Sequence, residues 1–448
     1  MLDIDIERYL DFQIMNLKEL EPIIKKIDTL QLKGRVKQVI GLVIESEGPP
    51  ASVGEICLIS QGKKKIRAEV VGFRDKNLCL MPIGSTEGIR VDDEVLATGK
   101  PLMVGVGEGL IGRVLNGVGQ PIDEKGSLLP ETEYPIFADS PDPLKRPRIK
   151  EVLPTGIRAI DSCLTVGKGQ RFGIFSGSGV GKSTLLGMTA RFTKADVNVI
   201  ALIGERGREV RDFIEKELQD EGLKRSVVVV ATSDQPPLVR LRAAFVATAI
   251  AEYFRDIGMD VMLMMDSVTR FARAQREVGL SIGEPPATRG FTPSVFALLP
   301  RLLERSGTSE RGTITGIYTI LVDADDMNEP ISDNVRAILD GHVVLSRELA
   351  EKNHYPAIDI LQSVSRVMID IVNEKQEQNA KRLRGILAII RDSQDLINIG
   401  AYVKGSNPKI DYAISKIDEV QEFLRQGIWE KSDYQHAISE LARVFEER

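Results

Sequence analysis

The stretch RFGIFSGSGVGKSTLLGMTARF, residues 171–192, decides the fold. Its centre, residues 176–184, ends like a phosphate-binding loop, whose pattern is G-x-x-x-x-G-K-[ST]. The apolar run RFGIFS before the loop predicts a strand, and KSTLLGMTARF after it predicts a helix. A phosphate loop needs this context, because backbone N–H groups and a helix N-terminus hold the phosphates together. The sequence therefore favours a nucleotide site over a chance glycine-rich turn.

The loop departs from the pattern at its first position, where Ser176 stands in place of glycine. Three glycines still keep Cβ atoms away from positions where backbone must approach phosphate: Gly177, Gly179 and Gly181. If position 176 required a positive φ, serine would strain the loop. We expect nucleotide to contact the whole loop, namely Ser176, Gly177, Ser178, Gly179, Val180, Gly181, Lys182, Ser183 and Thr184.

Three side chains in and after this loop point to phosphoryl chemistry. Lys182 would reach the β- and γ-phosphates, and the Ser183 hydroxyl would bind Mg²⁺. The apolar run VMLMMDS predicts a strand ending at Asp266, where such nucleotide hydrolases place a carboxylate that holds Mg²⁺. A lone Asp at a strand end is more often a turn residue, so this assignment depends on the phosphate loop.

A second polar cluster, GERGREV, follows the predicted strand NVIALIG. Ligands bind at the carboxyl edge of open α/β sheets, which is where this cluster would lie. Glu205 can orient and polarise an attacking water, Arg206 can neutralise charge, and Glu209 can brace the site one turn on. Acidic residues also favour the first turn of any helix. The residues alone leave the catalytic and the structural interpretation equally open.

The chain of 448 residues is long enough for about three domains. Residues 1–28 have an amphipathic helical pattern, either a partner-docking helix or an edge of the next domain. Residues 29–97 carry five or six short runs typical of strands, which predict a small barrel or sandwich. Residues 98–365 alternate apolar strands with amphipathic helices, one of them predicted over EVRDFIEKELQDEG, after a glycine- and proline-rich connection. Residues 366–448 are helical in pattern, and one predicted helix, DYAISKIDEVQEFLRQGIW, runs through Trp429.

The predicted fold class is therefore an α/β P-loop (RecA-like) core with a small N-terminal β-barrel and a C-terminal helical domain. The formal net charge of -6 gives no electrostatic argument for a nucleic-acid binder. Lys63 to Lys65 are interpreted as a solvated hairpin tip. The three cysteines lie far apart without a C-x-x-C pattern, which favours reduced structural thiols. No signal peptide or membrane span is recognised, so we expect a soluble, cytoplasmic protein.

Longer segments resemble a known family. The family is that of the catalytic subunits of rotary ATP synthases, and the closest likeness is to the ATPases of type III secretion systems, the flagellar export ATPase in particular. The resemblance extends from about residue 29 to residue 448. It is carried by GLIGRVLNGVGQPID, PTGIRAIDS, SGSGVGKST, IGERGREV, DSVTRFARAQRE, GEPPATRGFTPSVFALLPRLLERSG, DDMNEPISDNVRAILDGHVVLSR and HYPAIDILQSVSR.

The resemblance implies a homo-hexamer that uses ATP with Mg²⁺ at its subunit interfaces. It places the catalytic glutamate on Glu205 and the metal-side aspartate on Asp266. Tyr355 falls where an aromatic ring packs on adenine. Arg366 falls on the arginine finger, which reaches into the neighbouring subunit's site. Without the resemblance, Tyr355 would be assigned to the core and Arg366 to the surface at a helix start.

The implied function is ATP hydrolysis that drives or assists flagellar type III protein export. Implied partners are the export apparatus, stalk-like and regulator proteins, and chaperone–substrate complexes, with peripheral recruitment to the membrane export gate. Segment 1–28 is the hypothesised docking site for a regulator. Three alternatives remain: a virulence-type secretion ATPase, a non-catalytic nucleotide-gated ring subunit, and a hexameric RNA translocase. The last ranks low, because residues 29–97 offer Phe73 as their single aromatic residue for stacking bases.

Overall fold

The computed structural model describes residues 32–322 and 325–446. Chain contacts divide the molecule into two units. The first comprises Met1–Pro82 with Thr86–Lys100, and the second comprises Ile83–Ser85 with Pro101–Arg448. The predicted helix in residues 1–28 lies outside the described residues.

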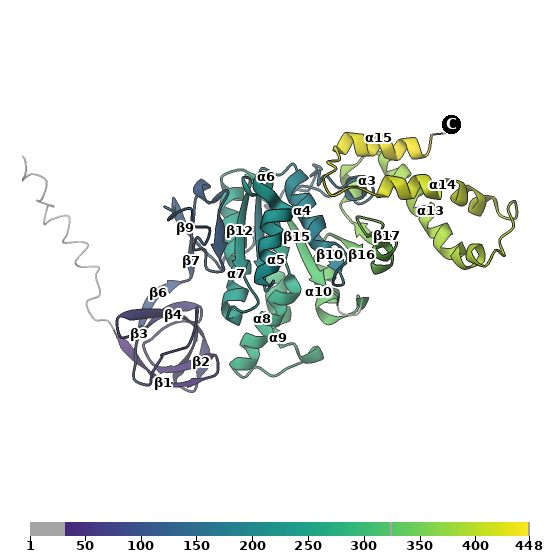
Figure 1. Ribbon diagram of the computed structural model, residues 1–448. Helices are drawn as coiled ribbons and strands as arrows, with labels where there is room; N and C mark the ends of the chain where they lie inside the picture. Colours follow the sequence, from purple (N-terminus) through teal and green to yellow (C-terminus); the bar gives the residue numbers. More distant parts are fainter. Residues whose placement is uncertain (1–31, 323–324, 447–448) are drawn as a thin grey trace, which may run out of the picture. The chain divides into compact units, whose positions relative to one another are not determined.

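The first unit is a closed barrel in the strand order β1-β2-β5-β4-β3-β6, drawn in purple in Figure 1. Alternate residues of these strands fill its interior, among them Ile44, Ile59 and Leu80. The lysine run lies exposed where β3 turns into β4, as predicted. The strands are β1 (Lys33–Ile40), β2 (Val43–Glu47), β3 (Glu55–Gln61), β4 (Lys64–Arg74), β5 (Asn77–Pro82) and β6 (Glu94–Pro101).

The second unit is built on a 9-stranded sheet in the order β17-β16-β10-β15-β13-β11-β12-β8, with β14 paired to β15. The sheet is parallel except for β14 and β17. Its central strands are buried along nearly their whole length because helices cover both faces. The strands are β8 (Val114–Asn116), β10 (Arg171–Ser176), β11 (Val197–Ile203), β12 (Ser226–Ala231), β13 (Asp260–Asp266), β14 (Gly307–Thr308), β15 (Thr313–Leu321), β16 (Gly341–Leu345) and β17 (Ile358–Ser365).

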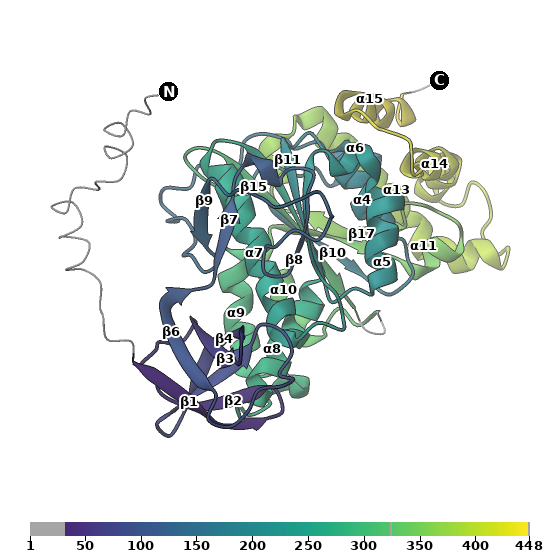
Figure 2. The same cartoon turned by 60° about the vertical axis from the view of Figure 1, so that its left-hand side comes forward.

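Helices pack on both sides of this sheet. Figure 2 shows α7 on one side and α4 and α5 on the other. The helices of this layer are α3 (Arg158–Cys163), α4 (Lys182–Phe192), α5 (Gly207–Asp212), α6 (Gln219–Leu223), α7 (Pro237–Asp256), α8 (Val268–Ser281), α9 (Pro293–Leu303), α10 (Pro330–Ile338) and α11 (Arg347–Glu351), with single 3-10 turns η1 (Glu108–Leu110) and η3 (Thr288–Gly290).

Two parts of the core differ from the sequence prediction. The glycine-rich connection contains structure of its own: a two-stranded antiparallel sheet of β7 (Met103–Val106) and β9 (Thr132–Pro135), and β8, which joins the edge of the large sheet. The helix predicted over EVRDFIEKELQDEG is interrupted by a π-helical turn, η2 (Phe213–Leu218). This turn packs against α4, where the Thr184 hydroxyl donates a hydrogen bond to Glu217 Oε1 at 3.0 Å. Such turns are frequent at functional sites.

The C-terminal region is helical, as predicted, and its helices gather beyond β16 and β17 in Figure 1. The helices are α12 (Met368–Ile371), α13 (Glu374–Asn398), α14 (Pro408–Leu424) and α15 (Tyr434–Val444). The helix predicted to continue through Trp429 is wrong at its end, because α14 stops at Leu424 and Arg425 is extended. No helix among residues 32–322 and 325–446 is long and apolar enough to cross a membrane. The predicted fold class is confirmed.

Candidate nucleotide site

The phosphate loop connects β10 to α4 without strain at its first position. Ser176 is the last residue of β10, and its backbone continues the sheet ladder beside Leu321 and Leu345. It is not among the residues with positive φ, so serine meets no backbone penalty there. Gly179 and Gly181 do have positive φ, at 77° and 92°. The loop therefore needs glycine at these two positions and tolerates serine at the first.

A Cβ atom at Gly177 would lie 2.7 Å from Asp325 Oδ1 and 2.8 Å from Arg347 Nη2, so a larger residue would displace the ends of these two exposed side chains. Lys182 is the first residue of α4, and the exposed Ser183 follows in its first turn. The loop and the helix N-terminus thus present backbone N–H groups and a hydroxyl together, which is the arrangement that binds phosphate.

Three charged side chains meet at the carboxyl edge of the sheet. Lys182 Nζ donates a hydrogen bond to Asp266 Oδ1 and lies 3.5 Å from Glu205 Oε1. Glu205 follows β11 and Asp266 ends β13, and these strands are neighbours in the sheet. Both carboxylates are more than nine-tenths buried, with 8% and 2% exposure. The structure therefore brings together three of the side chains that the sequence singled out.

The cluster raises the pKa of Glu205 to about 7. Burial is the main cause, and repulsion by the Asp266 carboxylate adds to it, while Lys182 and Arg270 oppose both. The pKa of the neighbouring Glu209 is lowered, chiefly by its hydrogen bond with Glu205. Glu205 Oε1 is buried and accepts no hydrogen bond from the described residues. A carboxylate with such a pKa is suited to accept a proton near neutral pH.

Arg270 is a member of this cluster that the sequence prediction missed. It lies in the first turn of α8, directly after Asp266 and Ser267, and its Nη2 donates to Glu205 Oε2 at 3.1 Å. The segment DSVTRFARAQRE contained a signal for it, since a helix starting at the strand end returns its fourth residue to the same edge. By contrast, the Arg206 side chain is 76% exposed, and it contacts Glu209 at 3.5 Å rather than Glu205.

A cavity lies next to the phosphate loop. This cavity of about 420 Å³ is bounded by the loop and α4 on one side and by Tyr355, which is 40% exposed, on the other. Its remaining wall comes from the segment after α14, residues 426–428. These three residues were not predicted as site residues. The size and largely apolar walls suit a nucleobase, because ligand pockets are mostly apolar with a few polar groups.

Within one chain, Arg366 belongs neither to the charged cluster around Lys182 nor to the cavity beside Tyr355. β17 runs antiparallel to β16, and its last residue, Ser365, pairs with Gly341, which in turn pairs with Phe172 near the start of β10. Arg366 follows directly and is exposed, so it lies at the sheet edge opposite the phosphate loop. In this chain it is a full strand length away from Lys182.

The residues present fit a magnesium ion. The Ser183 hydroxyl and the Asp266 carboxylate supply oxygen ligands, which Mg²⁺ prefers, and a cationic group, the Lys182 ammonium, already lies against Asp266. No cluster of three or more His, Cys, Asp or Glu that could hold a metal is found in the described part of the chain.

Comparison with known proteins assigns the chain to a family. Three family models match: the ATP synthase alpha/beta beta-barrel domain over residues 36–99, the nucleotide-binding domain over 156–365, and the T3SS EscN ATPase C-terminal domain over 372–443. The flagellum-specific ATP synthase of Bacillus subtilis is 56% identical, covering 96% of this chain and 99% of that protein. The type 3 secretion system ATPase of Xanthomonas euvesicatoria is 52% identical, covering 92% of this chain and 93% of that protein.

Solved structures agree. The assembled ATPase EscN from the enteropathogenic E. coli type III secretion system is 45% identical, with a TM-score of 0.88 over 92% of this chain and 99% of that one. EscN in complex with its central stalk EscO is 44% identical, with a TM-score of 0.86 over 92% of this chain and 99% of that one. The chain therefore belongs to the ATP synthase alpha/beta family, among the ATPases of flagellar and type III secretion systems.

Proposed function

We propose that the chain hydrolyses ATP to ADP and phosphate at the edge of the sheet where β10, β11 and β13 end. The observation that carries this proposal is the pairing of Lys182 with two buried carboxylates, those of Glu205 and Asp266, beside the phosphate loop. This pairing balances the charge of Lys182 before nucleotide binds. When ATP binds, the Lys182 ammonium can turn from the carboxylates to the γ-phosphate, which is also an anion.

Glu205 is the proposed group that orients the attacking water. Once Lys182 moves to the phosphates, Glu205 Oε1 is free to accept a hydrogen bond from water, while Arg270 holds Oε2 and fixes the orientation of the carboxylate. The ordinary role of such a group is to position the nucleophile and take its proton. Arg206, which is exposed, is available to approach phosphate from the solvent side.

Asp266 and Ser183 are the proposed magnesium-side residues. The Thr319 hydroxyl donates to Asp266 Oδ1 at 2.7 Å and, with Lys182, fixes that oxygen in place. When bound, Mg²⁺ held by these two residues would neutralise charge that develops on the phosphate oxygens. On the other side of the cavity, Tyr355 is proposed to stack on adenine.

We further propose that Arg366 acts on a neighbouring subunit in a homo-hexameric ring. Its place at the opposite edge of the sheet prevents it from reaching its own phosphate loop, and its exposure makes it available to a neighbour. A cation supplied in this way stabilises charge on the transferring phosphoryl group. The relatives' description as an assembled ATPase, in one case with a central stalk, supports a ring and a stalk-like partner.

The work done by hydrolysis is proposed to be protein export. The relatives are named flagellum-specific ATP synthases and type 3 secretion system ATPases, and the flagellar relative from Bacillus subtilis has the higher identity of the two described above. We therefore propose a flagellar export role, with recruitment to the membrane by partner proteins and with a regulator and chaperone–substrate complexes as further partners.

Substitution of the phosphate-loop lysine tests the proposed function. Lys182→Ala should abolish nucleotide binding and ATP hydrolysis, because it removes the cation that meets the phosphates. The matched control is Lys216→Ala, an exposed lysine on η2 that pairs with Asp212. Mg²⁺-dependent phosphate release is measured at concentrations that allow rings to form. Hydrolysis by Lys182→Ala at the wild-type rate, or none by the wild-type protein, would contradict the proposal.

A further inference from the structure

The segment after α14 ties the C-terminal helices to the nucleotide-binding core. We call residues 425–430 the strap. Its residues Gln426, Gly427 and Ile428 line the cavity together with Tyr355. The strap begins extended at Arg425 and then turns, with the Glu430 N–H donating to the carbonyl oxygen of Gly427 at 3.0 Å, and the core holds it at several points.

Gln426 is the central contact of the strap and is 5% exposed. Its backbone N–H donates to the carbonyl oxygen of Tyr355 at 2.9 Å. Its side-chain Oε1 accepts from the Arg158 N–H, the first of α3, at 2.7 Å. Its Nε2 donates to the carbonyl oxygens of Gly156 at 2.8 Å and Glu430 at 2.7 Å. The side chain thus joins the strap to the start of α3 and closes the strap on Glu430, while the backbone N–H joins it to Tyr355.

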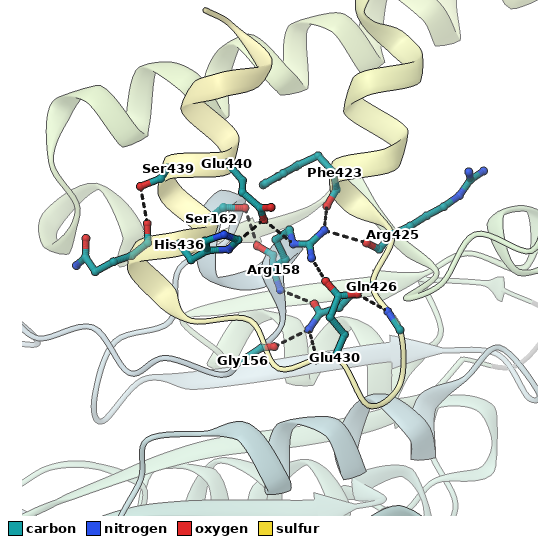
Figure 3. Close-up of polar contacts among 12 residues, drawn as sticks. Gly156, Arg158, Ser162, Phe423, Arg425, Gln426, Glu430, His436, Ser439 and Glu440 are labelled. Atoms are coloured by element: carbon teal, nitrogen blue, oxygen red, sulfur yellow. Dashed lines mark hydrogen bonds and ion pairs between the residues drawn. The ribbon is translucent and has the colours of Figure 1, made fainter.

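Arg158 completes the attachment, as Figure 3 shows. Its guanidinium donates to the carbonyl oxygens of Phe423 and Arg425, each at 3.2 Å. It also forms ion pairs with Glu430 and, at 3.2 Å, with Glu440 of α15. One largely buried side chain therefore binds the end of α14, the strap and α15 simultaneously. Because a planar guanidinium makes several bonds in fixed directions, it fixes the course of the strap.

A third anchor reaches the helix that begins at the phosphate loop. Arg191, near the end of α4, donates from Nη2 to the carbonyl oxygen of Ile428 at 2.8 Å. Its guanidinium lies 4.4 Å from the ring centre of Trp429. Trp429 is the single tryptophan of the chain, so its fluorescence reports on the strap alone.

We propose that Arg158 and Gln426 are positioning residues for the nucleobase: they hold the strap beside Tyr355 in the wall of the cavity, and through the strap they couple base binding to the C-terminal helices. This inference rests on the proposed nucleotide function. Neither residue touches the phosphate loop cluster, so their effect is confined to the part of the ligand that carries the base. Loss of the attachment lowers affinity for ADP but leaves affinity for bare phosphates unchanged.

Two ligands separate this role from general destabilisation. The Kd values of ADP and of inorganic triphosphate are measured by calorimetry for the full chain and for Arg158→Ala. We expect the Kd of ADP to rise about tenfold, as for loss of a base contact, and that of triphosphate to change by less than about twofold. In hydrolysis, KM rises with kcat nearly unchanged, because the lost interaction is with the base.

The matched control is Arg113→Ala, which removes another largely buried arginine, paired with Asp123 at 2.7 Å. It is expected to lower the unfolding temperature without changing either Kd. Should Arg158→Ala fail to fold, Glu430→Gln weakens the same attachment from a half-exposed partner, and a rise of about threefold in the Kd of ADP is expected.

Trp429 provides a readout without any substitution. Its emission should change when ADP saturates the wild-type protein and stay constant with triphosphate, because only the base reaches the strap. Unchanged ADP affinity in folded Arg158→Ala or Glu430→Gln, an equal loss for both ligands, or a constant Trp429 emission with ADP would each overturn the inference. If the wild-type protein bound neither ligand, the proposed function itself would fail, which is a different result.

Discussion

The phosphate side and the base side of the nucleotide site are built in different ways. On the phosphate side, short segments end at one sheet edge and place Glu205 and Asp266 against Lys182. On the base side, Tyr355 and the strap come from distant parts of the chain and form a largely apolar wall. The charged side chains of the phosphate side act on phosphoryl transfer, whereas the apolar surface of the base side recognises the nucleobase. We therefore expect changes to the first to alter kcat and changes to the second to alter KM.

Arg366 offers the largest test of this division, because it would extend the phosphate side across a subunit boundary. Arg366→Ala should lower kcat about 10³-fold, since a cation opposite the transferring phosphoryl group is worth that much or more in related chemistry. Steady-state hydrolysis measures the loss.

Mixing two inactive proteins shows whether Arg366 acts on a neighbour. Rings formed from Arg366→Ala and Lys182→Ala subunits contain some interfaces with an intact loop and an intact arginine. Part of the activity should return in the mixture, and each variant alone is its own control. If the mixture stayed as inactive as its components, Arg366 would not act between subunits.

The pH dependence tests the electrostatics of the phosphate side. Because the folded pKa of Glu205 is about 7, kcat/KM should rise about tenfold per pH unit below that value and level off above it. An acidic limb near pH 4.5 instead would mean that burial and Asp266 do not control this carboxylate.

The same shift predicts an effect on stability that needs no activity. A carboxyl whose pKa is raised on folding binds its proton more tightly in the folded state, so its contribution is complete below the unfolded value and declines as pH rises through about 7. The wild-type protein should therefore lose unfolding free energy relative to Glu205→Gln between pH 5 and pH 8. Parallel stability curves for the two proteins would contradict this.

Tyr355 tests the base side with a moderate effect. Tyr355→Ala should raise KM for ATP about tenfold through lost stacking, with kcat changed by less than about twofold. Tyr412→Ala, on the exposed surface of α14, is the control. A fall in kcat comparable to that from Arg366→Ala would show that the two sides are not separable.

The smallest effect is expected at the first position of the loop. Ser176→Gly should leave the Kd of ATP within about twofold of wild type, because serine at this strand position has no positive φ to relieve. Calorimetric titration with ATP measures this. A clearly tighter complex would indicate that Ser176 strains the loop after all.

The phosphate side could be predicted from the sequence because its chemistry is local. Glycines at fixed spacing, a lysine after them and carboxylates at strand ends are polar residues next to apolar runs, and parallel strands deliver their carboxyl ends to one edge. Arg270 was missed because one arginine in an arginine-rich helix looks like any other until its neighbour across the sheet, Glu205, is known.

The base side could not be predicted from residue patterns. Tyr355 was recognised through the family resemblance alone, and Gln426 and Ile428 were assigned to a helix that ends earlier. Their helical pattern is overridden by tertiary contacts, above all those of Arg158, which lies more than two hundred residues away in the chain. Arg366 likewise depends on the resemblance, since its role lies outside its own subunit.

Hydrolysis and binding by Glu205→Gln, measured together, test the central claim most directly. The change keeps the shape of the side chain but removes the proton acceptor, and Glu215→Gln, on the exposed face of η2, is the control. We predict that ADP binds as in wild type while kcat falls about 10²–10⁴-fold. Near wild-type hydrolysis by Glu205→Gln would contradict the account, because water would then be activated elsewhere.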